Sequence, residues 1–349
     1  MHLVSNTDFY HGIMGGCILG LSSSLFLLFT GQITGLSGIA EGLVSSKGED
    51  WHGSYVLGLC LSGTTMSLLF KDNSSSFDHH TSMLSTEMIV VAGLLTGFGT
   101  RLGSGCTSGH GLCGLPRRSL RSLVAVATFM STGAITAYIC HLPAVHPSLV
   151  SHHTLPRHQY LQPGTSIAVI AMIAGRYLNL FDAISSRDPS QGIASKAIRS
   201  SLSVHAASLL CGFSFGVGLI VSGMCNPSRV IRFLDFSSSD GWDPTLMAVL
   251  MSGVLINTVS FHVFKHSKLQ VVCEPRRDLG ASLHMGLVRP NLVIDWRLLL
   301  GSALFGVGWG IAGICPGPGL VSLGALSEGA TIFIPSVFIG MIIKQCFIS

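Results

Sequence analysis

The stretches that decide the fold are GTRLGSGCTSGHGLCGL (99–115) and LFGVGWGIAGICPGPGL (304–320). Each begins as an apolar segment suited to a membrane helix, but glycine, serine and proline in its second half interrupt regular helix. A cysteine stands at each interruption, Cys106 in the first stretch and Cys315 in the second. Irregular backbone at membrane depth is tolerated only where it is buried or lines a cavity. We therefore expect both stretches to be helices broken at a functional place.

The composition indicates a membrane protein. Only 10% of the 349 residues are charged, while 48% are hydrophobic and the mean hydropathy is +0.58; ordinary globular domains carry roughly 25% charged residues. The ten cysteines lie mostly inside apolar stretches, which favours reduced, buried thiols. The net charge of +4 comes without a basic run, so nucleic-acid binding is not expected. We expect the lipid bilayer to be the solvent of an all-α protein.

A spanning helix needs about 20 mostly apolar residues. Arginine and lysine gather in the connections 117–121, 182–200 and 265–297, which nine spans would place on one side of the membrane. By the positive-inside rule that side is cytoplasmic, so we expect the N-terminus outside and the C-terminus inside, in a plasma or inner membrane. The nine expected spans are 11–30, 52–70, 86–102, 120–141, 164–181, 201–221, 244–264, 298–315 and 329–348.

Small residues recur at every fourth position in several of these spans. Such spacing puts them on one helix face and lets two backbones approach closely. The repeated pattern predicts a compact helix bundle. The faces are Gly12, Gly16 and Gly20; Gly93 and Gly97; Gly212 and Gly216; and Ser302, Gly306 and Gly310.

Four glycine-rich breaks follow the first, third, sixth and eighth spans, and they pair by sequence. Ser37-Gly38-Ile39 is similar to Ser222-Gly223-Met224, and the surroundings of Cys106 are similar to those of Cys315. Since the two members of each pair enter from opposite faces, the pattern predicts a pseudo-two-fold inverted repeat with short re-entrant helical breaks. We expect one transport domain, 1–349, with halves 11–141 and 201–348 and a linking helix at 164–181. The breaks are ITGLSGIAEG (33–42), RLGSGCTSGHGLCG (101–114), LIVSGMCNPSR (219–229) and GIAGICPGPG (310–319).

These breaks predict a path for a small sulfur-containing anion. A neutral thiol is a weak, polarisable donor, and helix N-termini present free N–H groups without a formal charge. Arg101 and Arg229 flank breaks two and three as gating or anion-attracting residues, unless they extend to lipid headgroups. Glu41 and Glu328 are expected to make local caps or hydrogen bonds. The predicted path residues are Cys106, Cys315, Cys225, Ser37, Thr107 and His110.

Two other functions remain open at this point. Cys106, His110 and Cys113 suggest a metal transporter, but the spacing C-x3-H-x2-C is unusual and no second cluster completes four ligands, so no metal site is predicted. A membrane-embedded thiol enzyme that handles sulfane sulfur would need a base, and His110 is the only candidate within the breaks. No nucleotide-binding string is present, and we expect no cofactor and no enzyme activity.

The breaks also resemble a known family. TGQITGLSGIAEG (30–42), GLIVSGMCNPSRVIRFLDF (218–236) and the two stretches quoted first are similar to the signature segments of the YeeE/YedE sulfur-transport family, the thiosulfate permeases. The resemblance implies an hourglass-shaped protein of nine spans with short embedded helices at its waist. It implies thiosulfate uptake past a line of thiols, to which Cys106 and Cys315 correspond. The position of Cys225 need not be cysteine in the family, and a small TusA-like sulfur carrier is an implied partner.

Overall fold

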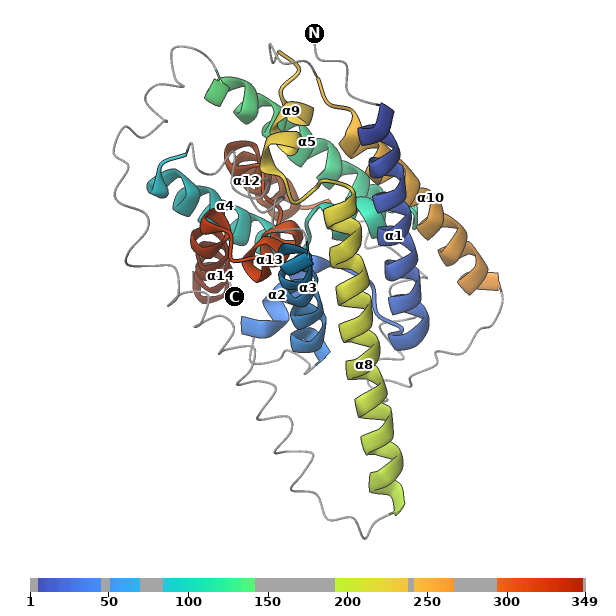
Figure 1. Cartoon of the computed structure of the whole chain (residues 1–349). Coiled ribbons are helices and arrows are strands. Elements are labelled where there is room, and N and C mark those ends of the chain that lie inside the picture. Colours follow the sequence, from blue (N-terminus) through green and yellow to red (C-terminus); the bar gives the residue numbers. More distant parts are fainter. Residues whose placement is uncertain are drawn as a thin grey trace.

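The protein is built from helices, as the sequence predicted. The computed structural model describes residues 6–44, 51–69, 84–141, 192–237, 242–266 and 294–347. Within these ranges the chain forms twelve helices (Figure 1). They are α1 (Asn6–Thr30), α2 (Leu36–Val44), α3 (Trp51–Leu69), α4 (Thr86–Leu102), the π-helix η3 (Thr107–Gly114), α5 (Leu120–His141), α8 (Gly192–Val221), α9 (Pro227–Leu234), α10 (Thr245–His266), α12 (Trp296–Ala312), α13 (Pro316–Gly324) and α14 (Glu328–Phe347).

Eight of the nine expected spans correspond to helices, and the ninth, 164–181, lies outside the described residues. Five helices, α1, α5, α8, α10 and α14, are long and apolar enough to cross a membrane alone. Two bent pairs, α4 with η3 and α12 with α13, raise the number to seven among the described residues. α3 fills the expected segment 52–70 but is not among the helices that are long and apolar enough to cross a membrane alone. The expectation of nine spans is therefore met by five to seven in this part of the chain.

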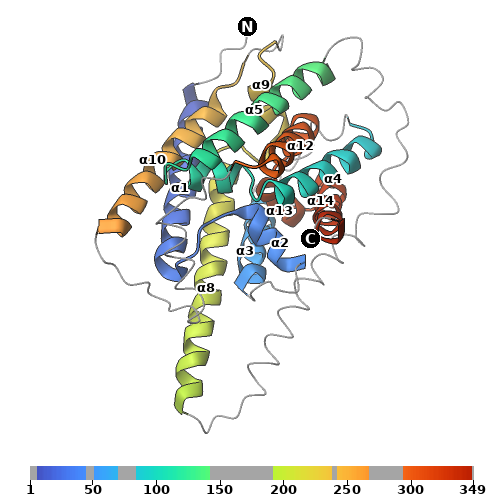
Figure 2. The same cartoon turned by 180° about the vertical axis from the view of Figure 1, so that it is seen from behind.

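The outer helices present apolar side chains to their surroundings. α10 lies at the edge of the molecule in both views (Figures 1 and 2). Its exposed hydrophobic residues recur at every fourth position, which aligns them along one face. A stripe of this kind would be costly in water and is suited to lipid. The stripe consists of Met247, Met251, Leu255, Val259 and Val263.

Helices from the two ends of the chain pack against each other. α1 contacts α8 and α10, α3 contacts α8, α4 contacts α12 and α14, and α5 contacts α12. Figure 1 shows α1 running downward from its N-terminal end and α8 running upward, so these two neighbours are antiparallel. Helices that precede residue 142 and helices that follow residue 191 thus share one bundle.

The predicted small-residue faces are confirmed as helix contacts. A Cβ atom added at Gly97 would collide with the backbone carbonyl of Val337, and one at Gly212 with the carbonyl of Tyr55. Ser302, which was expected on the last face, instead lies beside Gly103. Close backbone approach matters here because lipid supplies no hydrophobic drive between helices, which leaves van der Waals contact to hold them. The faces of α1, α4, α8 and α12 contact α10, α14, α3 and α5, respectively.

Candidate functional site

A residue in the left-handed conformation lies just before break one and within each of the other three breaks. Gly31, Gly223 and Gly313 have φ angles of 71°, 72° and 69°, and Ser104 in break two has φ of 60°. Glycine adopts this conformation without steric cost, which is why it commonly ends helices. After the turn a short second helix starts, so that α4 and η3 meet at 46° and α12 and α13 at 41°.

A cysteine follows three of these left-handed residues at the same distance. Cys106, Cys225 and Cys315 each stand two residues after the turn, and the next helix starts within two further residues. Cys106 and Cys315 are the N-cap residues of η3 and α13, and neither thiol caps its helix. Both thiols therefore lie at a helix N-terminus, where the backbone dipole favours negative charge.

The two helix N-termini are not equivalent as anion sites. η3 starts with residues that all carry N–H groups, whereas α13 starts Pro316-Gly317-Pro318 and retains one N–H in that turn. More backbone N–H groups are therefore available to bind an anion beside Cys106 than beside Cys315.

Break two contacts break four through a side-chain pair. The Thr107 hydroxyl and the Cys315 thiol lie 3.4 Å apart and share a hydrogen bond in which either group can donate. The structure thus brings together two residues that the sequence placed on one path, although they belong to opposite ends of the chain.

Break two also contacts break one. The Cys106 thiol, which is 1% exposed, lies 3.2 Å from the Ser108 hydroxyl. That hydroxyl also accepts a hydrogen bond of 3.0 Å from the backbone N–H of Leu36, at the start of α2. Ser37, the next residue of α2, is buried at the same junction. Breaks one, two and four therefore converge around the N-terminus of η3.

A third pair of the same kind lies at the other end of η3. The Cys113 thiol is 3.4 Å from the Ser23 hydroxyl of α1 and donates to the backbone carbonyl of Thr34 at 3.2 Å. Sequence reasoning had considered Cys113 only as a metal ligand, and nothing in its local sequence indicated Ser23 as a partner. Below, "thiol–hydroxyl pairs" means Cys106–Ser108, Cys315–Thr107 and Cys113–Ser23.

The ring nitrogens of His110 contact groups other than these thiols. Its Nδ1 atom lies 3.2 Å from the Ser122 hydroxyl, and its Nε2 atom lies 3.2 Å from the carbonyl oxygen of Gly103. The ring also occupies the space that a side chain at position 105 would need. Within the described ranges, no group of three or more His, Cys, Asp or Glu side chains is placed to hold a metal ion. In this conformation His110 braces the turn of break two.

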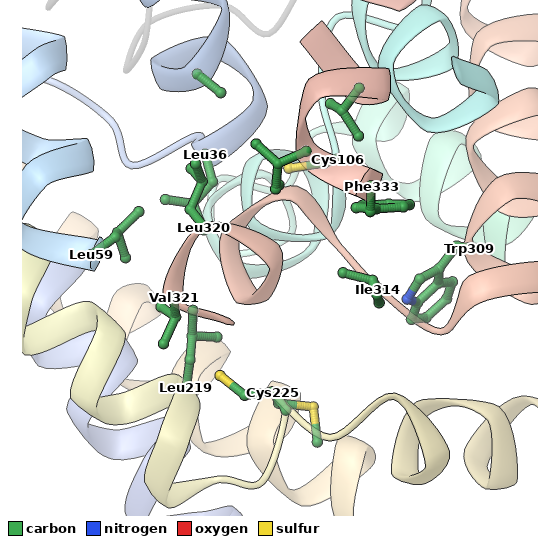
Figure 3. Packing of buried hydrophobic residues seen from close by; sticks show 14 of the residues in the cluster. Leu36, Leu59, Cys106, Leu219, Cys225, Trp309, Ile314, Leu320, Val321 and Phe333 are labelled. Atoms are coloured by element: carbon green, nitrogen blue, oxygen red, sulfur yellow. The ribbon is translucent and has the colours of Figure 1, made fainter. Parts of the chain in front are cut away.

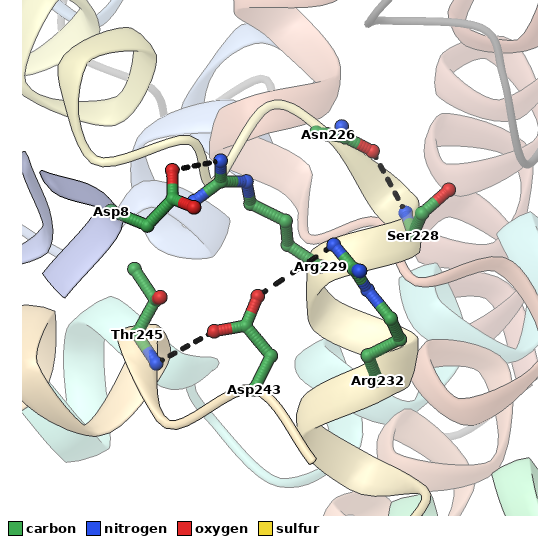
Figure 4. Close-up of polar contacts among 7 residues, drawn as sticks. All are labelled: Asp8, Asn226, Ser228, Arg229, Arg232, Asp243 and Thr245. Carbon is green, nitrogen blue, oxygen red and sulfur yellow. Dashed lines mark hydrogen bonds and ion pairs between the residues drawn. The ribbon is translucent and has the colours of Figure 1, made fainter. Parts of the chain in front are cut away.

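The two flanking arginines are paired with carboxylates. Arg101 forms an ion pair with Glu41 of α2, and Arg229 donates to Asp8 of α1 at 2.6 Å (Figure 4). The Arg229 side chain also covers Gly223 in break three. Both charges are thus partly neutralised beside the breaks that they flank.

Cys225 is buried within the hydrophobic core with Met224 (Figure 3). Among the described residues it has no hydrogen bond to the thiol–hydroxyl pairs. Cys17, on α1, is half-buried. The structure therefore groups Cys106, Cys315, Thr107 and Ser37 closely and leaves Cys225 at a separate break.

Two family models match the chain in succession. The model described as "Sulphur transport" matches residues 6–136, and the model described as "Family of unknown function (DUF6691)" matches residues 204–348. A "Probable transporter" of Xylella fastidiosa (strain Temecula1 / ATCC 700964) is 40% identical over 131 residues, which are 38% of this chain and 94% of that protein. A second "Probable transporter" of the same strain is 36% identical over 137 residues, 39% of this chain and 85% of that protein.

The membrane-length helices, the two bent pairs and the transporter relatives together define a polytopic membrane transport protein. More specifically, the chain belongs to the sulphur-transport family, the YeeE/YedE family. The resemblance seen in the sequence is thereby confirmed, and the substrate class is sulfur-containing.

Proposed function

We propose that this protein imports thiosulfate along a path formed by the thiol–hydroxyl pairs. The observation that carries the proposal is the contact between Thr107 and Cys315, which joins the two cysteine-bearing bent pairs. Because Cys106 directly precedes Thr107, an anion held at Cys315 is one residue away from the next thiol. The thiols thus form successive binding positions for the anion, called stations below.

The chemistry of the pairs suits this ion. Thiosulfate has a soft terminal sulfur and hard oxygens, and each pair supplies one polarisable thiol and one hydroxyl. The hydrogen bond within a pair can be exchanged for bonds to the anion, so that few bonds are lost on entry. None of these groups carries a formal charge. Binding therefore stays weak enough for release, as a permeation path requires.

The other predicted residues take different parts in this proposal. Ser37 and Cys225 extend the path into breaks one and three, where each is buried. His110 holds the turn of break two in shape through Ser122 and Gly103. Arg101 and Arg229 attract the anion at the mouths of the path when their carboxylate partners release them.

An inverted repeat, with an hourglass shape narrowed where the breaks meet, is part of the proposal. Its support is that the helix contacts have counterparts: α1–α10 corresponds to α8–α3, and α4–α14 to α12–α5. A finer counterpart joins the short helices. The Asn257 amide of α10 donates to the carbonyl of Leu112 in η3, as the Cys60 thiol of α3 donates to the carbonyl of Leu320 in α13. The two family matches, 6–136 and 204–348, also fall close to the proposed halves.

The orientation follows from charge. Arg117, Arg118 and Arg121 lie at the connection from η3 to α5, which we assign to the cytoplasm with the C-terminus, in a plasma or inner membrane. Cys346, exposed near the end of α14, tests this assignment. A membrane-impermeant maleimide should label it in inside-out vesicles and not in right-side-out ones. A TusA-like carrier would then receive the ion at the cytoplasmic face.

The observations favour transport over the two other functions. A thiol enzyme would need a base beside its nucleophile, but the ring nitrogens of His110 contact Ser122 and Gly103. A metal transporter would need a ligand cluster, and Cys106, His110 and Cys113 form none among the described residues.

Uptake of labelled thiosulfate into proteoliposomes tests the proposal. Cys106→Ala and Cys315→Ala should each reduce the initial rate about tenfold, because each removes a donor to a charged ligand. Cys346→Ala is the matched control and should behave as wild type, since Cys346 is exposed at the far end of α14. Wild-type uptake that neither path substitution alters would overturn the proposal.

A further inference from the structure

Two hydroxyl groups without hydrogen-bond partners lie beside the third thiol–hydroxyl pair. They are the Tyr55 hydroxyl of α3 and the Thr34 hydroxyl of the segment between α1 and α2. Both side chains are 0% exposed, and neither hydroxyl has a partner within the described part of the chain. Buried hydroxyls are nearly always hydrogen-bonded, so two unpartnered ones together call for a partner from outside the chain, either a water molecule or a ligand.

The surroundings of these hydroxyls are polar and come from several helices. The Tyr55 side chain has Thr34, Ser22, Cys113 and Cys211 as neighbours, and the hydroxyls of Thr34 and Ser22 lie near the Tyr55 hydroxyl without meeting hydrogen-bond geometry with it. Ser22 donates to the carbonyl of Cys211, which ties α1 to α8 at this place. The neighbourhood thus contains thiols and hydroxyls, and none of these side chains carries a formal charge.

The Tyr55 ring is held in position by other aromatic rings. Its centroid lies 5.0 Å from that of Phe26, in an edge-to-face contact, and 6.5 Å from that of Phe215. These contacts fix the direction of the phenol group. A hydroxyl with a fixed direction is a preorganised donor, which lowers the entropy cost of binding.

The segment 34–36 connects this place to the proposed path. The N–H of Leu36 binds the Ser108 hydroxyl beside Cys106, while the carbonyl of Thr34 accepts from the Cys113 thiol. The segment thus runs along η3 from one thiol–hydroxyl pair to another. An anion leaving Cys106 along η3 would next meet Cys113, Thr34 and Tyr55.

We propose that Tyr55, Thr34 and the Cys113–Ser23 pair form a second binding station for thiosulfate beyond Cys106. This inference rests on the proposed transport function. The hydroxyls of Tyr55 and Thr34 donate to the oxygens of the anion, and the Cys113 thiol faces its terminal sulfur. With more hydroxyls than the other two pairs supply, this station selects for oxyanions.

The test is thiosulfate uptake by the full chain in proteoliposomes. Tyr55→Phe removes one oxygen and retains the ring contacts, while Thr34→Val replaces the hydroxyl with a methyl group. Each change should lower the initial rate about tenfold, as expected for a lost donor to an anion. Tyr138→Phe is the matched control, because Tyr138 is an exposed tyrosine of α5, and it should keep the wild-type rate.

Thr34→Ser keeps the hydroxyl and should retain most of the uptake that Thr34→Val loses. This comparison separates the hydroxyl from side-chain shape, since the valine variant keeps the shape and loses the hydroxyl, whereas the serine variant loses the methyl group and keeps the hydroxyl. If Tyr55→Phe and Thr34→Val transport at the wild-type rate, the hydroxyls hold only a water molecule and the station is excluded. If uptake depends on Cys106 and not on Tyr55 or Thr34, the station fails while the transport proposal stands. If wild type shows no thiosulfate uptake, the transport proposal fails first.

Discussion

The hydroxyl of Thr107 lies 3.4 Å from the thiol of Cys315, although 208 positions separate the two residues in the sequence. Thr107 is the first residue of η3, and Cys315 directly precedes α13. Each short helix is the second member of a bent pair, so this contact joins the two breaks at the N-terminal ends of their short helices. A ligand bound between these groups would touch both halves of the chain.

We expect this contact to matter for transport through its hydroxyl. Thr107→Val should lower the initial rate of thiosulfate uptake about tenfold, because a donor to a charged ligand is lost while side-chain volume is kept. Thr107→Ser should retain near-wild-type uptake. Equal rates for the valine and serine variants would show that the hydroxyl plays no part.

The turn of break two should depend on a glycine. A Cβ at Gly105 would lie 2.5 Å from Nε2 of the His110 ring, so Gly105→Ala should destabilise the protein by about 1–3 kcal/mol through overpacking. Thermal unfolding in detergent measures this loss as a lower melting temperature. Gly38→Ala is the control, because no atom lies within 4 Å of a Cβ added there.

The contact between position 105 and the His110 ring also predicts a partial rescue. Combining Gly105→Ala with His110→Ala removes the colliding ring, so the double variant should be destabilised by less than the sum of the two single changes. Strictly additive losses would contradict the close contact between position 105 and the His110 ring.

The ion pair between Asp8 and Arg229 predicts an effect of salt on uptake. Asp8→Asn should leave the Arg229 charge free to attract a dianion, which lowers the apparent KM about threefold at low ionic strength; the effect is modest because the pair is partly exposed. Added salt should remove the difference, since exposed charges are screened. The double variant Asp8→Asn/Arg229→Gln should lose the gain. A KM for Asp8→Asn that stays at the wild-type value at low salt would contradict an anion-attracting role for Arg229.

The sequence predicted best those helix contacts and helix ends that depend on residues close together in the chain. Glycine spacing such as that of Gly93 and Gly97 predicted helix contacts correctly, because every fourth residue of a helix shares a face. Gly223 and Gly313 predicted helix ends for a similar reason, since they adopt the left-handed turn themselves.

The side-chain pairing could not be predicted in the same way. Cys113 meets Ser23 across 90 positions, and this contact depends on how α1 packs beside η3. Glu41 had been expected to bond locally but pairs with Arg101 of α4, for the same reason. The sequence pattern also left the π-helical form of η3 undetected, because glycine and serine are compatible with several backbone conformations.

The most direct measurement is a structure of the protein in lipid nanodiscs with thiosulfate. We expect density for the anion within hydrogen-bonding distance of the Cys106 and Cys315 thiols, with the Thr107 hydroxyl turned toward it. Density for thiosulfate only at sites away from both thiols, in a preparation that transports it, would show that the thiols do not form the path.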